Sequence, residues 1–590
     1  MSRSTTHPDP GAASPRAPAF ASVELGLVGS GGDGIVLIGN LLLEMAARQG
    51  LYGVLVLSYG PQIRGGESAA VLRIATHPVQ YEGDEVDLLL CFRASDVRRF
   101  EGHIRLHPGS HLILEASDTG PLPAWLGGHE HATYRFPFAR IENGIEVPGE
   151  PRNMLGLGLV CRALGWSDTL ARESLRARFG HRPEALARNL AAFDRAYATA
   201  EPPPALPSLP VAHGEAGLRV VETGNEAVAR AAIASGLRFF AGYPITPSSE
   251  IMETLLEEMS PEQGPVVQAE DEIAALGMVL GASFGGRPAM TATSGPGLSL
   301  MTEMMGLSSM AELPAVIVDC QRVGPATGMP SRTEQSDLWH AVFAGHGDFP
   351  RCVLGVFDVV HAHEVTNKAF RLAEAYQLPV LVLSDAYIAQ RTEAHDPVPP
   401  LGVVPARRTW QAGDSPRRFE IVDIDRGVGA FHVPGTADGT YMAAGIEHTL
   451  EGNPTADGAT HHRMNVKRFA KLDAIAVETR DWVRLLGPPA ARRGIVAWGS
   501  QYGMLREWLP RHPNYRAFFP EIIDPFPLVA FEEWARELEY LAIVELSFQG
   551  QLHRYLAGLT DLRSAVSIAR SGGMPLTWAD LSRLLGEEQP

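Results

Sequence analysis

The side chains best suited to chemistry are gathered in residues 239–338. Thr246 stands inside the run Tyr-Pro-Ile-Thr-Pro at 243–247, whose prolines fix φ and keep the residues before them out of the helical region. The run is therefore predicted to be a stiff turn that holds the Thr246 hydroxyl in one place at the top of a strand. Two serines follow the turn and can cap a helix over 250–259.

Glu272 is the second chemical candidate. Ile273, Leu276 and Leu280 recur at helical spacing, so Glu272 is predicted to open a helix whose other positions are mostly Ala or Gly. Another surface can approach a carboxylate closely when its neighbours are small. If that surface is apolar, loss of hydration raises the pKa of the carboxyl group and lets it hold a proton near neutrality. A solvated glutamate that interacts with the helix dipole is the competing interpretation, and the local pattern does not decide between them.

Several motifs of this stretch, taken together and in order, resemble the 2-oxoacid:ferredoxin oxidoreductases, enzymes that depend on thiamine diphosphate, and among them the 2-oxoglutarate type. The matching segments are Tyr243–Ser249, the helix opened by Glu272, Ser294–Gly297, Glu312–Pro314 with Arg322, and Gly324–Pro330 with Arg332. The stretch resembles the pyrimidine-binding domain of the alpha subunit of that family.

The resemblance implies roles for the first two motifs. Glu272 would hydrogen-bond N1′ of the cofactor's aminopyrimidine and favour its imino tautomer, with Glu270 as the alternative residue. Thr246 would contact the substrate or the first adduct by a hydrogen bond. The cofactor itself supplies the carbanion chemistry, and the protein supplies orientation and protonation. The cofactor would lie against the start of the turn, at Tyr243, Pro244 and Ile245.

The resemblance also implies a substrate site. Arg322 and Arg332 are candidates for the substrate carboxylates, because a guanidinium group binds a carboxylate bidentately, and two arginines would suit a dicarboxylate. The competing interpretation for each arginine is a surface or interface ion pair. Residues 294–297, Ser-Gly-Pro-Gly, would form a turn where the backbone approaches a ligand or a subunit, although such a sequence also makes an ordinary loop.

The N-terminal part is predicted to form a separate α/β domain. A strand over 23–28, a glycine turn, an apolar helix over 35–48 and a strand over 53–57 make a βαβ unit, and the glycines fit the dinucleotide-binding spacing. The second strand, however, ends in Ser-Tyr-Gly where that fingerprint requires an acid for the ribose. The glycine motif alone is therefore weak evidence for a dinucleotide-dependent dehydrogenase.

The segment after this unit resembles the gamma domain of the same family, in which the glycine turn and an Arg-Gly-Gly loop lie near the coenzyme A site and the subunit contacts. Consecutive glycines let backbone amides point at an anion, and the arginine adds positive charge. A tight loop that only shapes an interface is the competing interpretation. The residues associated with coenzyme A in this way are Gly31, Gly32, Arg64, Gly65 and Gly66.

The predicted fold class is multidomain α/β. The predicted divisions are a disordered tail at 1–21, a gamma-type domain at 22–200, a linker at 201–215, a pyrimidine-binding domain at 216–395, a connecting segment at 396–490 and a transketolase C-terminal-like domain at 491–590. The linker contains Glu-Pro-Pro-Pro-Ala-Leu-Pro-Ser-Leu-Pro, a stiff spacer that is typical of a fusion joint.

Composition excludes several function classes. Of the 590 residues, 45% are hydrophobic and 20% charged, as in ordinary globular enzymes, and the net charge of −18 argues against nucleic acid as a partner. The four cysteines show no C-x-x-C spacing, so no zinc or iron–sulfur site is predicted in this chain. No apolar run approaches the ~18 residues that span a bilayer, and no secretory signal is recognisable, so a cytoplasmic location is expected.

Part of the expected active site is missing from the sequence. Related enzymes bind the diphosphate and magnesium with a Gly-Asp-Gly motif and a downstream Asn, whereas the only such tripeptide here, at 32–34, lies in the gamma-like turn without a suitable asparagine. The resemblance therefore implies a beta subunit that brings the diphosphate site, Mg²⁺ and a [4Fe-4S] cluster to an alpha–beta heterodimer or its dimer.

The complex would convert 2-oxoglutarate and coenzyme A to succinyl-CoA and CO₂ while reducing ferredoxin, a reaction of the tricarboxylic acid cycle. Two alternatives remain open from the sequence. The same enzyme type could act on pyruvate or branched-chain 2-oxoacids. The chain could also be a non-catalytic subunit that binds coenzyme A or serves as a scaffold.

Overall fold

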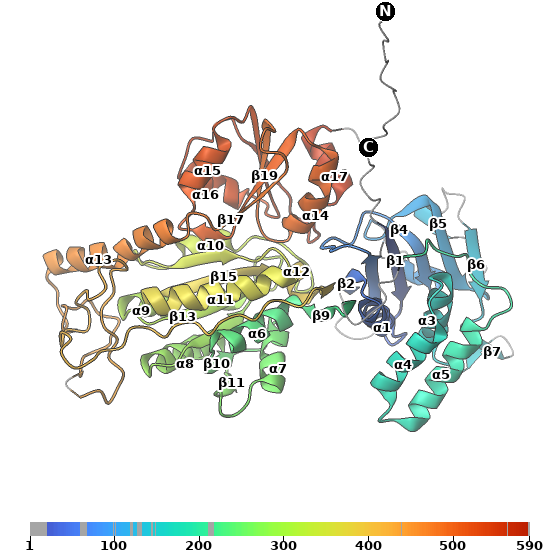
Figure 1. Ribbon diagram of the computed structural model, residues 1–590, viewed down its shortest axis with the longest axis horizontal. Coiled ribbons are helices and arrows are strands. Elements are labelled where there is room, and N and C mark those ends of the chain that lie inside the picture. Colours follow the sequence, from blue (N-terminus) through green and yellow to red (C-terminus); the bar gives the residue numbers. More distant parts are fainter. Residues whose placement is uncertain are drawn as a thin grey trace, which may run out of the picture.

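The computed structural model of the chain contains three α/β bodies (Figure 1), which confirms the predicted fold class. An N-terminal domain is drawn in blue and teal, a central domain in green and yellow, and a C-terminal domain in orange and red. The described residues are 21–59, 68–97, 100, 102–118, 122–126, 132–142, 145–147, 149–210, 217–437, 439–562 and 564–587.

The N-terminal domain is built on a sheet of order β6-β5-β4-β1-β3-β2. Its strands are β1 (Ser22–Gly29), β2 (Tyr52–Tyr59), β3 (Ser68–Ala75), β4 (Val86–Cys91), β5 (Leu106–Glu115) and β6 (Ala132–Phe136), with a separate hairpin of β7 (Arg140–Glu142) and β8 (Ile145–Val147). Its helices are α1 (Ile35–Arg48), α2 (Ala94–Val97), α3 (Arg152–Ala163), α4 (Asp168–Phe179) and α5 (Pro183–Tyr197).

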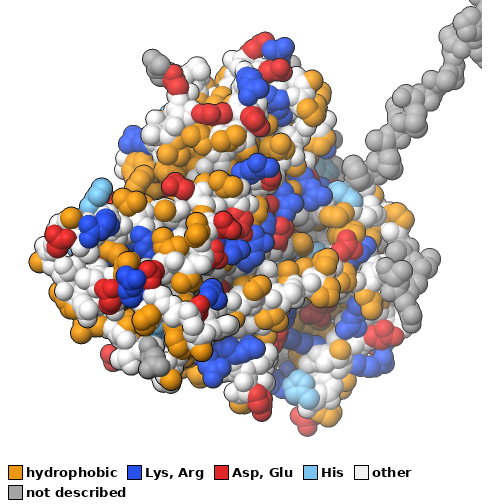
Figure 2. Space-filling model, turned by 60° about the vertical axis from the view of Figure 1, so that its left-hand side comes forward, with side chains coloured by type: hydrophobic (Ala, Val, Ile, Leu, Met, Phe, Trp, Pro, Cys, Tyr) orange, Lys and Arg blue, Asp and Glu red, His pale blue; other side chains and the backbone are white. Residues whose placement is uncertain are grey.

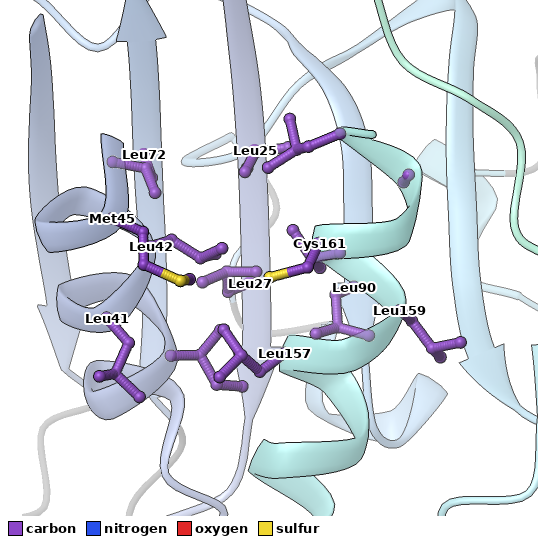
Figure 3. Packing of buried hydrophobic residues seen from close by; sticks show 14 of the residues in the cluster. Leu25, Leu27, Leu41, Leu42, Met45, Leu72, Leu90, Leu157, Leu159 and Cys161 are labelled. Atoms are coloured by element: carbon purple, nitrogen blue, oxygen red, sulfur yellow. The ribbon is translucent and has the colours of Figure 1, made fainter. Parts of the chain in front are cut away.

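The core of this domain lies between the sheet and helices α1 and α3. Leu42 and Met45 of α1 and Cys161 of α3 meet Leu25 and Leu27 of β1 in a cluster without polar side chains (Figure 3). Helix α1 is apolar around most of its circumference, and nine of its residues are buried. The predicted βαβ unit is therefore present, with the helix boundaries that the apolar run indicates.

Two strands of the central region continue the N-terminal sheet. Strand β16 (Thr392–His395) pairs antiparallel with β2, and β9 (Val220–Thr223) pairs with β16, so the sheet has eight strands in all. The proline segment before β9 also packs on the N-terminal domain, because Leu206 is buried in its core and donates its N–H to Ala163 O at 2.8 Å.

The central domain has a seven-stranded sheet of order β11-β10-β12-β13-β15-β14-β20. Every residue of β13 and β15 is buried, as expected for parallel strands covered on both faces. Its strands are β10 (Phe239–Gly242), β11 (Val266–Gln268), β12 (Ala289–Thr293), β13 (Ala315–Gln321), β14 (Cys352–Gly355) and β15 (Pro379–Asp385). One face is covered by α6 (Gly224–Ser235), α7 (Ser249–Glu258) and α11 (Val359–Tyr376), and the other by α8 (Glu272–Phe284), α9 (Gly295–Met310) and α10 (Leu338–Phe343); α12 (Ala386–Gln390) follows β15.

The C-terminal domain has a five-stranded sheet of order β17-β19-β18-β21-β22. This sheet starts before residue 491, since its edge strand β17 directly follows the long helix α13 (Gly458–Glu478). Strand β20 (Ile522–Asp524) leaves this domain and pairs with β14 of the central sheet. The remaining elements are β17 (Val483–Leu486), β18 (Arg493–Ala497), β19 (Tyr515–Pro520), β21 (Tyr540–Glu545), β22 (Val566–Ala569), α14 (Gln501–Trp508), α15 (Leu528–Ala535), α16 (Gln551–Ala557) and α17 (Trp578–Leu585).

The surface of the molecule is mixed in charge. On the face in Figure 2, acidic and basic side chains are interspersed over the described residues, without one broad basic patch. No described helix combines the length and the apolar character that a bilayer crossing requires.

Candidate active site

Four neighbouring parallel strands bring the predicted chemical residues to one edge of the central sheet. Strands β11, β10, β12 and β13 are adjacent and run in the same direction. Glu272 follows β11, Thr246 follows β10, the 294–297 segment follows β12, and Arg322 follows β13. Ligands of open α/β sheets bind at this carboxyl edge. The topology therefore brings together Thr246 and Arg322, which are more than seventy positions apart in the sequence.

The turn after β10 presents Thr246 to solvent. Tyr243, Pro244 and Thr246 are exposed, whereas Pro247 and Ser248 are buried and fix the turn to the domain. The Thr246–Pro247 peptide bond is cis. Ser248 does not cap the following helix as predicted, because its hydroxyl donates to Ile245 O at 3.0 Å. The Thr246 hydroxyl is therefore accessible on a well-anchored turn.

Glu272 opens α8, as the helical spacing predicts, and its side chain is buried. The preceding Asp271 caps the helix by accepting the N–H of Ala274 at 2.7 Å, which leaves Glu272 free of that task. No described residue forms an ion pair or hydrogen bond with the Glu272 carboxylate. Glu270, the alternative from the sequence, is exposed. Burial without a partner distinguishes Glu272 from an ordinary first-turn glutamate.

Gly297 lies directly against Glu272. A Cβ at this position would overlap Thr293 Oγ1 and would lie 2.6 Å from Glu272 Oε1. The prediction of a turn over 294–297 is wrong in one respect, because α9 begins at Gly295 and Pro296 occupies its first turn, where a missing N–H costs nothing. Close approach to the Glu272 carboxylate explains why a glycine is needed at 297. Thr293 was not among the residues predicted from the sequence, and neither was this contact.

The two predicted substrate arginines have different surroundings. Arg322 is buried and donates from Nη1 to Thr246 O at 2.6 Å, while its Nε has no partner among the described residues. Burial lowers the pKa of Arg322, and the nearby Asp337 opposes that shift. The Arg322 guanidinium is therefore hydrogen-bonded to the Thr246 turn, and its Nε–H has no described acceptor.

Arg332 points elsewhere, although its main chain is adjacent. Its carbonyl accepts the N–H of Val323 at 3.0 Å, so residues 323–332 form a closed loop. Its Nη1 lies 3.2 Å from Met574 Sδ, in a small cavity that is also lined by Ser58 at the end of β2. The structure thus brings Arg322 and Thr246 together and directs Arg332 to the junction of the three domains.

Known proteins resemble both the N-terminal and the central part of the chain. Residues 230–468 match the family described as "Pyruvate flavodoxin/ferredoxin oxidoreductase, thiamine diP-bdg", and residues 24–199 match "Pyruvate ferredoxin/flavodoxin oxidoreductase". The 2-oxoacid:ferredoxin oxidoreductase 2 subunit alpha of Aeropyrum pernix is 34% identical over 470 residues, which cover 75% of this chain and 71% of the relative. The chain belongs to the 2-oxoacid:ferredoxin oxidoreductase family.

Other members resemble the chain over nearly its full length. The 2-oxoglutarate oxidoreductase subunit KorA of Mycobacterium tuberculosis is 28% identical over 610 residues, covering 94% of this chain and 90% of the relative. The structure of the 2-oxoglutarate:ferredoxin oxidoreductase from Magnetococcus marinus with 2-oxoglutarate, coenzyme A and succinyl-CoA bound superimposes with a TM-score of 0.86 at 31% identity, over 96% of this chain and 99% of that chain.

The residues at the sheet edge fit the pyrimidine ring of the thiamine diphosphate that this family uses. An aminopyrimidine requires a carboxylate that is not already neutralised, and the buried Glu272 has no ion-pair partner among the described residues. Ser294 Oγ, also buried, lacks a hydrogen-bond partner among the described residues, so a further polar group is free at the start of α9.

The glycine turn of the N-terminal domain is exposed at Gly31 and Gly32, and Gly32 has a φ of 97° that favours glycine. Asp33 closes the turn by accepting the N–H of Ser30 at 2.8 Å. The loop with Arg64, Gly65 and Gly66 lies outside the described residues. The accessible glycines remain candidates for an anionic ligand.

One other cluster has the composition of a metal site. His361, Glu364 and Glu521 approach one another. Arg484 Nε lies 2.7 Å from Glu521 Oε1, and Lys368 also contacts Glu521. His361 Nδ1 accepts the N–H of Phe357 at 3.1 Å. The cations already neutralise the carboxylates, so the cluster is an ion-pair network between the central and C-terminal domains.

Proposed function

We propose that this chain is the fused gamma–alpha subunit of a 2-oxoglutarate:ferredoxin oxidoreductase. The enzyme oxidatively decarboxylates 2-oxoglutarate, transfers the succinyl group to coenzyme A and passes electrons to ferredoxin. The observation that carries this proposal is the buried, unpartnered Glu272 against Gly297, at the sheet edge that also holds Thr246 and Arg322. The relatives named for 2-oxoglutarate support this substrate over pyruvate or branched-chain 2-oxoacids.

Each residue has a distinct task in this proposal. Thiamine diphosphate, when bound, supplies the carbanion chemistry. Glu272 holds the proton at pyrimidine N1′ and orients the ring, with Tyr243, Pro244 and Ile245 as the adjacent wall. Thr246 donates a hydrogen bond to the substrate, and the guanidinium group of Arg322 binds a substrate carboxylate. Arg332 binds a second carboxylate only if the substrate reaches the domain junction.

A beta subunit completes the site by contributing the diphosphate-binding domain, Mg²⁺ and the [4Fe-4S] cluster. The outer surface of α8 and α9 next to Glu272 supports such a partner. It exposes apolar Ile273, Met278 and Leu300, and side chains added at Gly277 or Gly281 would meet nothing within 4 Å. Unburied apolar and small residues beside a half-complete site are typical of a subunit interface.

We assign the gamma-type domain to 22–200, the linker to 201–215, the pyrimidine-binding domain to 216–395, the connecting segment to 396–490 and the transketolase C-terminal-like domain to 491–590. Three strands cross these bounds: β9 and β16 extend the N-terminal sheet, and β17 of the connecting segment extends the C-terminal sheet. Coenzyme A is assigned to the exposed turn at Gly31 and Gly32. Backbone N–H groups in such a turn suit a phosphate group.

Anaerobic viologen reduction by this chain co-purified with its beta subunit tests the proposal. A panel of 2-oxoacids is compared with and without coenzyme A, and the chain alone is the control. Reduction with 2-oxoglutarate that requires coenzyme A and is absent from the chain alone is the expected result. A pair that holds cofactor and cluster but reduces viologen with none of the 2-oxoacids would overturn it in favour of a scaffolding role.

A further inference from the structure

A buried asparagine, Asn225, contacts the Thr246 turn, and the proposed chemistry does not use it. It lies in the first turn of α6 and is 1% exposed. Its Nδ2 donates to Pro247 O at 2.8 Å and to Glu250 Oε2 at 3.2 Å, and its Oδ1 accepts from Cys320 Sγ at 3.5 Å. Burial of an amide is costly unless its polar atoms are hydrogen-bonded. These three contacts therefore fix the side chain in one orientation.

The backbone of the turn is held at two consecutive carbonyl groups. Thr246 O accepts from Arg322 Nη1 at 2.6 Å, and Pro247 O accepts from Asn225 Nδ2. Because proline fixes φ at 247, rotation of these two peptide groups is the main freedom left to the turn. The two donors therefore determine where the Thr246 hydroxyl points.

Asn225 also connects two strands that are not neighbours. In the central sheet β12 lies between β10 and β13, so the two described strands that lead to Thr246 and Arg322 share no ladder of backbone hydrogen bonds. Asn225 makes a connection from α6, because it binds Pro247 after β10 and Cys320 within β13. The asparagine thus relates the position of one candidate residue to that of the other.

The main chain at Asn225 is itself anchored. Thr223, the last residue of β9, caps α6, since its Oγ1 accepts the N–H of Glu226 at 3.1 Å and its own N–H donates to Glu226 Oε2 at 2.8 Å. A Cβ at Gly224 would lie 2.2 Å from Ile388 O, so the chain packs closely against α12 at this point. The amide of Asn225 therefore extends from a backbone that is fixed by a helix cap and by α12.

We propose that Asn225 is a positioning residue that holds the Thr246 hydroxyl in the orientation that binds the 2-oxoacid. It acts through Pro247 O, since each polar atom of its side chain is bonded within the protein. The inference rests on the proposed role of Thr246 as a hydrogen-bond donor to the substrate. Loss of the amide frees the Pro247 peptide group, and a displacement of about 1 Å can cost about 10²-fold in rate.

Two substitutions in the assembled enzyme test this role. Asn225→Leu removes the amide at nearly constant side-chain size, and kcat/KM for 2-oxoglutarate is expected to fall about 10–100-fold. Asn225→Ser has a side chain one bond too short to reach Pro247 O, and it places no apolar group beside the Glu250 carboxylate. It serves as the second variant if Asn225→Leu does not fold, and its kcat/KM should fall at least about tenfold.

Asn367→Leu is the matched control. Asn367 of α11 also donates from Nδ2 to two acceptors, Ser235 Oγ at 2.9 Å and Gly402 O at 3.0 Å, but Ser235 is at the opposite end of α6. The control should leave kcat/KM unchanged. Hydrogen exchange of the peptide that contains the Thr246 turn adds a readout independent of turnover. Exchange should be faster in Asn225→Leu and unchanged in Asn367→Leu.

A double-mutant cycle separates positioning from a general loss of structure. Thr246→Ala removes the hydroxyl that Asn225 is proposed to orient. Addition of Asn225→Leu to this variant should therefore lower kcat/KM by no more than about threefold further. A structural role that is independent of Thr246 would instead multiply the two losses.

Wild-type kcat/KM in both Asn225 variants, or multiplied losses in the double variant, would overturn the inference. So would an equal loss in Asn367→Leu, or unchanged hydrogen exchange of the turn in Asn225→Leu. Failure of the proposed function is distinguishable, because Thr246→Ala would then retain wild-type kcat/KM or the wild-type pair would not turn over 2-oxoglutarate.

Discussion

Two buried glutamates of the central domain, Glu272 and Glu312, have opposite environments. Glu312 follows α9 and is fully buried, and it binds Lys467 and, at 2.7 Å, Lys471, which lie one turn apart on α13. These cations hold the pKa of Glu312 well below its usual range. Glu272 has no cation among the described residues and lies against a glycine and a threonine.

The difference separates a structural carboxylate from one that is available for chemistry. Glu312 is neutralised within the chain and fixes α13 to the central domain. Its ion pairs therefore stabilise the folded state. Glu272 is buried without an ion-pair or hydrogen-bond partner among the described residues, so its carboxylate is available to a ligand in the space next to it.

The largest effect is expected for Glu272→Gln in the assembled enzyme. Loss of the proton-holding group should lower kcat by about 10²–10⁴-fold, the usual contribution of a positioned acid or base. The thermal unfolding midpoint should not fall, because no described partner is lost. Steady-state viologen reduction and calorimetry of the same preparation check both parts. Activity close to wild type would remove Glu272 from the proposed mechanism.

Glu312→Gln should lower the stability of the fold and not kcat, which is the reverse of the effect expected for Glu272→Gln. Two lysines would be left buried without their counter-ion, and breaking such a cluster costs about 3–5 kcal/mol. Because the pKa of Glu312 is depressed, its stabilising contribution is present above the unfolded value of 4.5 and is lost as pH falls below it.

Urea unfolding at neutral pH measures the cost of Glu312→Gln. The matched control is Glu303→Gln on the exposed face of α9, where the ion pair with His346 is solvated and the change should stay within about 0.5 kcal/mol. Equal losses in the two variants would contradict the assignment of Glu312 as an anchor.

Gly297→Ala probes the close approach to Glu272 without altering any titratable group. The added methyl group would displace the carboxylate or Thr293, and a shift of this size should lower kcat by about 10–100-fold. Gly306→Ala in the same helix is the control, since its Cβ would meet nothing nearer than 3.8 Å. If both variants retain wild-type kcat, the contact between Gly297 and Glu272 has no catalytic importance.

The smallest effect on activity is expected for lysine substitution of the buried Arg322, with the buried Arg407 as the comparison. Arg322→Lys keeps the charge but loses the forked donor, so KM for 2-oxoglutarate should rise about tenfold with little change in unfolding free energy. Arg407→Lys should instead lower stability, because Arg407 binds Glu374 through Nε at 2.8 Å and Nη2 at 2.6 Å. If Arg407→Lys raised KM as much as Arg322→Lys, Arg322 could no longer be distinguished from a structural arginine as a substrate-binding residue.

The sequence predicted much of the fold because the chain is locally consistent. The apolar run of α1, the small-residue helix after Glu272 and the strand that delivers Tyr243 were all recognisable from spacing, and the resemblance supplied the order of the domains. Pairing between distant strands was not accessible in this way. Nothing local in residues 392–395 indicates that they join β2, because strand partners are chosen by tertiary packing.

The candidate active site was predictable from the sequence to a similar extent. Residue types pointed to Glu272, Thr246 and Arg322, but only the structure separates the buried Glu272 from the exposed Glu270 and directs Arg332 away from Thr246.

The exchange of strands between the domains has a mechanical consequence. Strands β16 and β9 extend the N-terminal sheet, and β20 extends the central one, so both boundaries are crossed by ladders of backbone hydrogen bonds. Paired strands therefore couple the three bodies. A movement of one body relative to another must either break these backbone hydrogen bonds or bend the segments that lead into β9, β16 and β20.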